Sequence, residues 1–236
     1  MRSAMDADRA AGDEAVMILA KDYSDEARAL WGTALDLNRV AAAVSPAAGR
    51  LPPLLFFTDP ERTPRPWETA ARLPAGAGLV FRAFGRADAL EVGWRLRAAT
   101  AGRGVRLLIG LDAELASRLD ADGVHLPERA MAEAAALRRR CPEWLLTSAW
   151  HGGPLAQDAA GLDALVLSPV FPAGGVSAGK PALGVEAFRK RADAAPCPVY
   201  ALGGINADRG NELHKSGACG IAGIDAVQTA FRPVRT

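Results

Sequence analysis

From residue 54 onward, short apolar runs alternate with longer amphipathic segments. Most runs are four or five residues long and end at a glycine or a polar residue, which is typical of buried strands. Regular alternation of this kind predicts a parallel sheet with right-handed crossovers. Eight such units predict closure into a (β/α)8 TIM barrel, with strands expected at residues 54–58, 79–82, 105–109, 123–126, 144–148, 164–167, 198–202 and 217–223. A doubly wound open sheet is the alternative, but no G-x-G-x-x-G opens its first unit.

The segment before the first strand has a different pattern. Leu30, Ala34, Leu37 and Ala41 recur at helical spacing, and Ser24 stands where a helix cap is expected. A stretch rich in Pro and Gly follows at residues 45–53. The chain therefore divides into an N-terminal helical extension, residues 1–50, and a TIM-barrel domain, residues 51–236. We expect the extension to plug the barrel bottom or pack on its side; the alternative is a helix that binds a partner.

Composition narrows the class of protein. The chain has 28 Lys plus Arg against 27 Asp plus Glu, so no basic face predicts nucleic-acid binding. Its three cysteines are widely spaced, which fits neither a disulfide framework nor a zinc site. No apolar run reaches the ~18 residues of a membrane span, and the N-terminus does not resemble a signal peptide. We expect a cytoplasmic protein with reduced thiols that binds neither nucleic acid nor membrane. Its expected partner is a small molecule, and whether it forms a homo-oligomer is left open.

In a TIM barrel the active face is built at the carboxyl ends of the strands. Arg82 ends the second predicted strand and could clamp a phosphate or pair with a structural Asp. His125 lies within a strand, where a hydrogen-bonded core histidine is the better interpretation. His151 follows the fifth strand and is the best general acid or base candidate. Trp150 beside it stands where it could stack on a ring.

Glycines follow the last two strands. The usual phosphate site of a TIM barrel lies in the turns after strands seven and eight, which here contain Gly203, Gly204 and Gly223. Residues 174–180 have the spacing of a nucleotide-binding P-loop, but Pro181 stands where Ser or Thr must bind magnesium. We expect this segment to be an active-site loop that brings Lys180 toward a bound anion.

Several motifs together resemble one family. They are Ala-Asp-Gly-Val-His-Leu (121–126), Leu-Ser-Pro-Val-Phe-Pro (167–172), Pro-Ala-Leu-Gly (181–184), Val-Tyr-Ala-Leu-Gly-Gly-Ile-Asn (199–206) and Gly-Ala-Cys-Gly-Ile-Ala-Gly-Ile (217–224). Their order and separations resemble thiamine-phosphate synthase and its relative, the thiazole tautomerase. The resemblance implies a transferase of thiamine biosynthesis that binds a thiazole phosphate and joins it to a pyrimidine diphosphate with magnesium assistance.

The resemblance also implies the site residues. The catalytic set is His151, Arg82 and Lys180, and the substrate or phosphate set is Arg82, Ser148, Ser168, Gly203, Gly204, Gly223, Ile224 and Asp225. Asp225 replaces a Ser of the family, and its charge would repel a phosphate unless Arg82 or Lys180 compensates. Gly110-Leu111 and Ala130 stand where the family has its magnesium carboxylates, so Asp112 and Glu128 become the candidate ligands for Mg2+.

Two alternatives to the synthase follow from these departures. A metal-independent, tautomerase-like enzyme would use His151 as its acid or base. A non-catalytic barrel would bind a thiazole or pyrimidine ligand, or a partner protein through its N-terminal helices.

Overall fold

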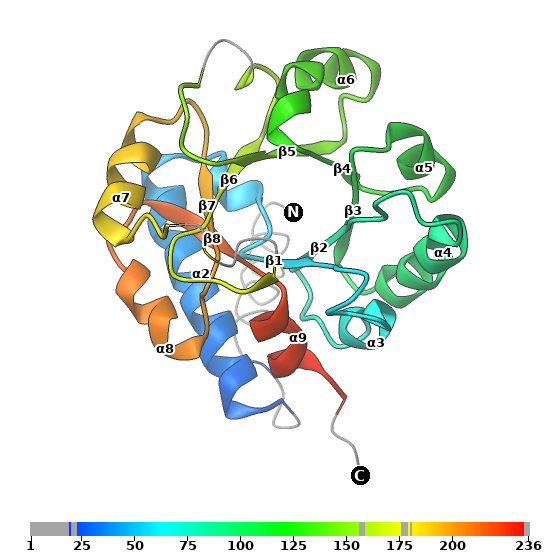
Figure 1. Cartoon of the computed structure of the whole chain (residues 1–236), viewed down its shortest axis with the longest axis horizontal. Helices are drawn as coiled ribbons and strands as arrows, with labels where there is room; N and C mark the ends of the chain where they lie inside the picture. The colour runs from blue at the N-terminus through cyan, green and yellow to red at the C-terminus, as the bar shows by residue number, and fades with distance from the viewer. Residues whose placement is uncertain (1–18, 20–22, 156–158, 176–178, 180, 234–236) are drawn as a thin grey trace, which may run out of the picture.

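The computed structural model describes residue 19 and residues 23–155, 159–175, 179 and 181–233. Within these ranges, eight parallel strands close into a barrel in chain order, so β1 pairs with both β2 and β8. Figure 1 looks along this ring of strands, with helices around its outside. The TIM barrel is confirmed and the open sheet is excluded. The strands are β1 (Leu54–Phe57), β2 (Gly78–Phe81), β3 (Arg106–Gly110), β4 (Gly123–Leu126), β5 (Leu145–Trp150), β6 (Ala164–Leu167), β7 (Val199–Leu202) and β8 (Ala218–Gly223).

Helices follow most of the strands. The alternating pattern also predicts a helix between the fifth and sixth strands, at residues 154–160, and this segment falls partly outside the described residues. Two of the other helices begin at a capping residue: side-chain oxygens of Asp112 and Asn206 accept backbone hydrogen bonds at the N-termini of α5 and α8. The helical elements are α3 (Pro66–Ala70), α4 (Ala89–Thr100), α5 (Ala113–Arg118), η2 (Glu128–Glu133), α6 (Ala134–Arg140), α7 (Val185–Ala194), α8 (Ala207–Gly210), η5 (Asn211–Leu213) and α9 (Asp225–Phe231).

The strands bury both of their faces, as a parallel barrel requires. One face packs against the helices, and the other forms a separate inner cluster that includes Leu55, Phe57, Val80 and Tyr200. Apolar side chains therefore fill most of the barrel interior.

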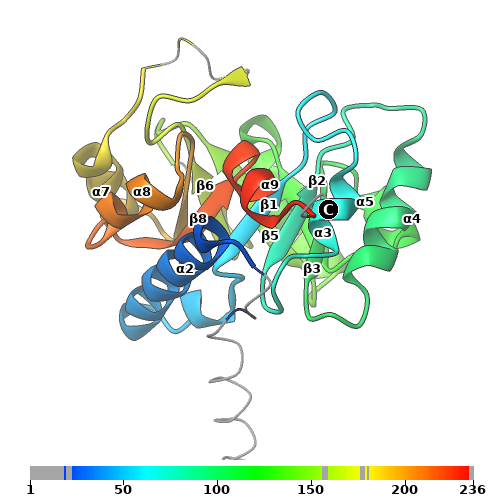
Figure 2. The same ribbon diagram turned by 90° about the horizontal axis from the view of Figure 1, so that it is seen from below.

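The extension packs on the side of the barrel. Helix α2 (Asp25–Val44) lies along β8 and beside α8 and α9, as Figure 2 shows. Ser24 is its cap, as predicted, and its Oγ accepts a hydrogen bond from the Ala27 N–H at 3.1 Å. The Asn38 amide donates to the carbonyl of Cys219 at 3.0 Å and to that of Ala48, in the short helix η1 (Ala48–Arg50), at 2.9 Å. Thus α2 is part of the barrel's core. The residues of the N-terminal extension before 23, apart from residue 19, lie outside the described part of the chain.

Strand β5 is longer than predicted, because it continues to Trp150. The Trp150 side chain is 4 % exposed and its Nε1 donates to the Gly153 carbonyl at 2.8 Å. The expectation that Trp150 could stack on a ligand ring is therefore wrong. Within the described ranges, no helix has the length and apolar character needed to cross a bilayer.

Candidate active site

Arg82 lies directly after β2, at the barrel mouth. Its Nε donates to the Thr58 carbonyl at 2.7 Å, and its Nη2 lies 3.3 Å from Asp59 Oδ2. The guanidinium also lies over the rings of Phe57 and Phe84. Burial lowers the pKa of Arg82 from its ordinary value, and the nearby positive charge of Arg62 adds to the effect, against the charge of Asp59. The structure thus shows the pairing with an Asp that was one of the two interpretations of Arg82.

His125 lies in β4, below the mouth, and is buried. Its Nδ1 is 2.9 Å from Thr147 Oγ1, and its ring meets the edge of Phe57. Burial lowers its pKa to about 3, and the charge of Arg82 acts in the same direction. It is therefore neutral at pH 7, and the interpretation as a hydrogen-bonded core histidine is confirmed.

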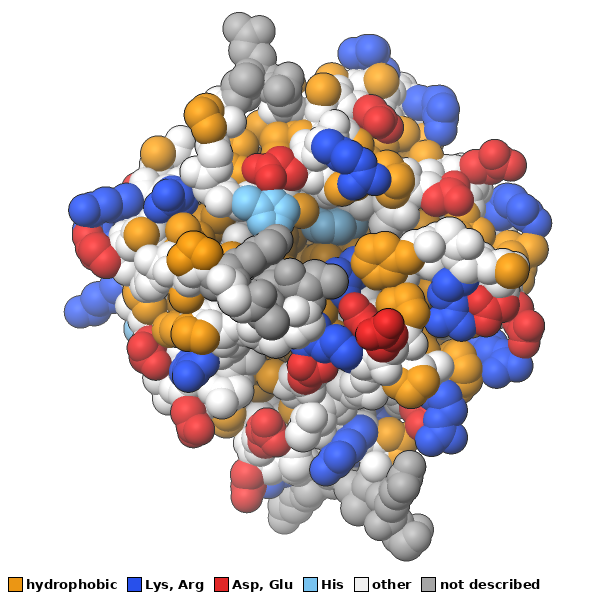
Figure 3. All heavy atoms as spheres, in the orientation of Figure 1, with side chains coloured by type: hydrophobic (Ala, Val, Ile, Leu, Met, Phe, Trp, Pro, Cys, Tyr) orange, Lys and Arg blue, Asp and Glu red, His pale blue; other side chains and the backbone are white. Residues whose placement is uncertain are grey.

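His151 forms a pair with Glu128. Glu128 Oε2 accepts from His151 Nδ1 at 2.6 Å, and Oε1 accepts from the His151 backbone N–H at 3.1 Å. Glu128 begins η2 after β4, and His151 follows β5. A carboxylate that holds Nδ1 fixes the ring orientation and leaves Nε2 for a ligand, which is the usual arrangement of an acid or base histidine. Figure 3 shows histidine side chains and an acidic group gathered near the centre of this face.

The two candidate magnesium ligands both have hydrogen-bond partners within the protein. The Asp112 carboxylate caps α5 by accepting from the Leu115 N–H at 2.8 Å, and Glu128 is engaged by His151. Across the ranges that the structure describes, no three His, Cys, Asp or Glu side chains are grouped to hold a metal ion. Magnesium is usually held by one or two carboxylates together with waters and substrate phosphates. Whether Asp112 and Glu128 replace the family's metal ligands therefore stays a prediction, although each carboxylate already accepts a hydrogen bond within the protein.

The glycines after β7 are required by packing. Gly203 and Gly204 have φ values of 105° and 65°, which glycine adopts most readily. A Cβ on Gly204 would lie 2.4 Å from the Pro172 carbonyl oxygen, and one on Gly203 would lie 2.9 Å from Pro169. This close contact joins the turn after β7 to the loop after β6. Whether Gly203, Gly204, Gly223 and Ile224 bind phosphate stays a prediction.

The two serines of the predicted site differ in exposure. Ser148 is fully buried, and its hydroxyl donates to the Ala149 carbonyl at 3.2 Å. Ser168 is half-buried at the end of β6. Their contacts with a substrate stay predictions. Lys180 lies outside the described residues.

Arg62 was missed by the sequence analysis. It lies in the segment after β1 and forms a two-point pair with Asp225, at the start of α9: Nε donates to Oδ1 at 2.9 Å, and Nη2 donates to Oδ2. The expectation that Arg82 offsets Asp225 is corrected, since Arg82 pairs with Asp59 and Arg62 pairs with Asp225. The same expectation for Lys180 falls outside the described residues. Closure of the barrel places β1 beside β8, and only that closure brings these two residues together.

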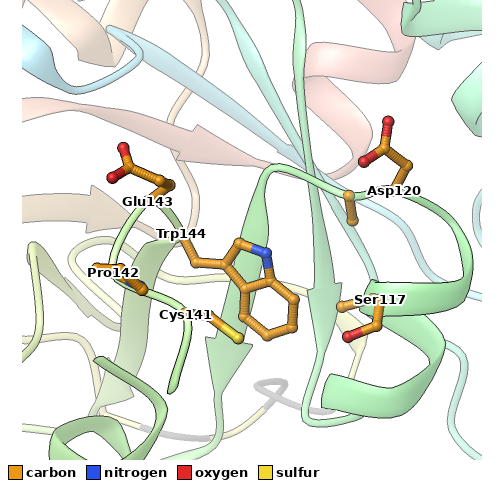
Figure 4. A pocket seen from close by; sticks show the side chains of 8 residues that line it. Ser117, Asp120, Cys141, Pro142, Glu143 and Trp144 are labelled. Atoms are coloured by element: carbon orange, nitrogen blue, oxygen red, sulfur yellow. The ribbon is translucent and has the colours of Figure 1, made fainter. Parts of the chain in front are cut away.

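Two hollows lie away from this mouth. One, of about 310 Å3, lies beside α5 and is lined by Cys141 and Trp144 (Figure 4). The other, of about 1540 Å3, lies at the amino ends of the strands near Pro52 and Val199. All three cysteines are free; Cys219 is buried, and Cys141 and Cys197 are half-buried.

Together these features define a (β/α)8-barrel protein with polar side chains at the carboxyl ends of its strands. The family model for thiamine monophosphate synthase matches residues 58–227. The chain therefore belongs to the thiamine-phosphate synthase family, whose proteins act in thiamine biosynthesis on phosphorylated small molecules.

Curated relatives agree with this membership. A thiamine-phosphate synthase of Archaeoglobus fulgidus is 34% identical over 145 residues, which cover 61% of this chain and 69% of that protein. A putative thiamine-phosphate synthase 2 of Aquifex aeolicus is 34% identical over 131 residues, covering 55% and 69%. The solved thiamine phosphate pyrophosphorylase of Pyrococcus furiosus has a TM-score of 0.63 at 24% identity, covers 78% of this chain and 93% of its own, and supports the fold.

Proposed function

We propose that this protein binds a thiazole phosphate and joins it to a pyrimidine diphosphate to form thiamine phosphate. The observation that carries the proposal is Arg82, which directly follows β2 at the mouth and whose side chain is only 20% exposed. A partly buried guanidinium binds phosphate oxygens more strongly than one in bulk water, because the local dielectric is lower. Family membership supplies the reaction class.

In this reaction the bond between the pyrimidine methylene carbon and the diphosphate oxygen breaks. The departing pyrophosphate takes the electron pair, and the thiazole nitrogen then donates its own pair to the methylene carbocation. The site must stabilise the charge of the leaving group. We expect guanidinium groups of the chain, Arg82 among them, to contribute to that stabilisation.

Calorimetric titration and a product assay test the proposal. The purified protein is titrated with thiazole phosphate, thiamine phosphate and the pyrimidine diphosphate, with magnesium and with a chelator. We expect thiamine phosphate to form from the mixed substrates, and Arg82→Gln to abolish its formation. Binding of every ligand without any product would instead favour the non-catalytic barrel.

A second candidate rests on the pair of His151 and Glu128. We propose as the alternative that His151 Nε2 removes and returns a proton of a thiazole phosphate, with no metal, while Glu128 holds the ring. Incubation in heavy water, followed by NMR of the ligand, would show exchange of a thiazole proton. His151→Gln should stop the exchange without loss of binding, whereas His214→Gln, which changes an exposed histidine outside the mouth, should not. Unchanged exchange in His151→Gln would exclude this role.

A further inference from the structure

Helix α4 exposes a tryptophan on the outside of the barrel. Val92 and Leu96, on its inner face, are buried. A Cβ on Gly93 would lie 2.4 Å from Leu119 Cδ1, so this inner face is closed against its neighbours. Trp94 lies on the outer face and is 51% exposed, whereas tryptophan is highly buried on average. Figure 2 shows α4 at the outer edge of the described chain, where its ring is available to a partner.

The outer face of α4 has a shape that is complementary to itself. Ala98 follows Trp94 by one helical turn and is exposed. A large ring therefore lies beside a residue that carries only a methyl group. When two such helices pack antiparallel, the ring of each helix covers the methyl group of the other.

The charges beside the ring are also complementary to themselves. Glu91 and Arg95 form an ion pair of 2.7 Å, one helical turn apart, and their side chains are 66% and 52% exposed. The Arg95 guanidinium also lies 4.8 Å from the ring centroid of Trp67, on α3. An arginine held in this way loses little conformational freedom on binding. A guanidinium has five N–H donors and a carboxylate two acceptor oxygens, so both groups keep capacity for a further partner.

The same surface has no net charge. Besides Glu91 and Arg95, it carries Arg65 and Glu68 of the α3 segment, which pair at 3.0 Å. A partner of one charge sign, such as a nucleic acid or an acidic peptide, would gain nothing from this balance. A second copy of the same surface matches it, because a two-fold axis brings each acid of one copy to a base of the other.

We propose that α3 and α4 form an isologous interface between two copies of this chain, with Trp94 at its centre. The two α4 helices pack antiparallel, so Trp94 of each copy covers Ala98 of the other. Glu91 of each copy then lies within reach of Arg95 of the other, and the four charges form one network. Tryptophan and arginine are the residue types most enriched where interfaces are strongest. The interface does not include the barrel mouth, and the inference is independent of the proposed function.

Sedimentation equilibrium of the full chain over a range of concentrations tests the interface. We expect a dimer, and we expect Trp94→Ala to raise its dissociation constant by at least about tenfold, because each dimer loses two central rings. Val44→Ser, which changes an 86% exposed apolar residue on α2, should leave the dissociation constant unchanged. Circular dichroism should show the same fold in both variants, since both side chains are largely exposed.

Two outcomes of this measurement would overturn the proposal. One is a wild-type protein that is monomeric at every concentration up to about 100 μM, which is weaker than a specific interface requires. The other is a dimer that Trp94→Ala leaves intact, because the interface would then lie elsewhere on the molecule.

Two charge variants test the antiparallel arrangement. Glu91→Arg leaves only positive charge at these two positions and Arg95→Glu only negative charge, so each variant alone should dimerise on the order of tenfold more weakly than wild type. An equimolar mixture should form a heterodimer, counted by native mass spectrometry, with an affinity within about threefold of the wild-type dimer. If the Glu91 and Arg95 pair served only the stability of its own helix, mixing would restore nothing. Absence of the heterodimer would therefore overturn the proposed interface.

Discussion

Tyr200 provides a stability test of the barrel interior. Its ring is fully buried inside the strands, and its hydroxyl donates to the Pro52 carbonyl at 2.6 Å. Tyr200→Phe keeps the ring and removes the donor, so a buried carbonyl loses its partner. Such a loss costs about 1–3 kcal/mol in free energy of unfolding. For a chain of this length, about 2 kcal/mol corresponds to a fall of about 4–8 °C in Tm.

The size of this loss should depend on pH. Burial raises the pKa of Tyr200 well above its ordinary value, and the neighbouring Cys219 acts in the same direction. Above the unfolded pKa of about 10, the unfolded chain releases a proton that the folded chain keeps, so the Tyr200 contribution to stability decreases as pH rises. The difference between wild type and Tyr200→Phe should therefore be full at pH 8 and smaller at pH 11.

Urea unfolding followed by tryptophan fluorescence, at both pH values, measures the difference. Tyr23→Phe is the matched control, because Tyr23 is only half-buried and the described contacts of its side chain are made by the ring, which Phe retains. Equal stability of Tyr200→Phe and wild type at pH 8, or a difference that does not change with pH, would refute the reasoning.

Three further changes test other parts of the structure. The pKa of His125 is depressed to about 3 in the folded protein, so the unfolded chain binds a proton first as pH falls. The contribution of His125 to the free energy of unfolding should therefore be complete above pH ~6.5 and decrease by about 1.4 kcal/mol per pH unit below it. Urea unfolding of His125→Gln should lack that decrease. Gly204→Ala should lower the free energy of unfolding, measured in urea, by at least about 1 kcal/mol, because its φ is 65° and the new Cβ would clash with the backbone. Gly174→Ala should leave it unchanged, because a Cβ there would have no atom within 4 Å. Asn38→Ala should lower the free energy of unfolding by about 2 kcal/mol, since the hydrogen bonds from α2 to β8 and to η1 are lost. An unchanged Tm would show that α2 is not part of the cooperative core.

Much of the site could be located from the sequence, because strand ends are local features. Arg82 and His151 were expected at the mouth, and the structure places both there. Their partners were not predicted. Glu128, a candidate metal ligand, holds His151, and the charge of Asp225, which Arg82 or Lys180 was expected to compensate, pairs with Arg62.

The sequence by itself determined the number of strand units, the order of strands and helices, and which end of the barrel carries polar chemistry. Those properties follow from hydrophobic periodicity and from turn residues, which act over a few positions. Only the tertiary structure decided which charges are paired, because Arg62 and Asp225 are 163 positions apart and meet through closure of β1 against β8. The free energy of an ion pair depends on distance and burial, and neither is set by neighbouring residues in the chain.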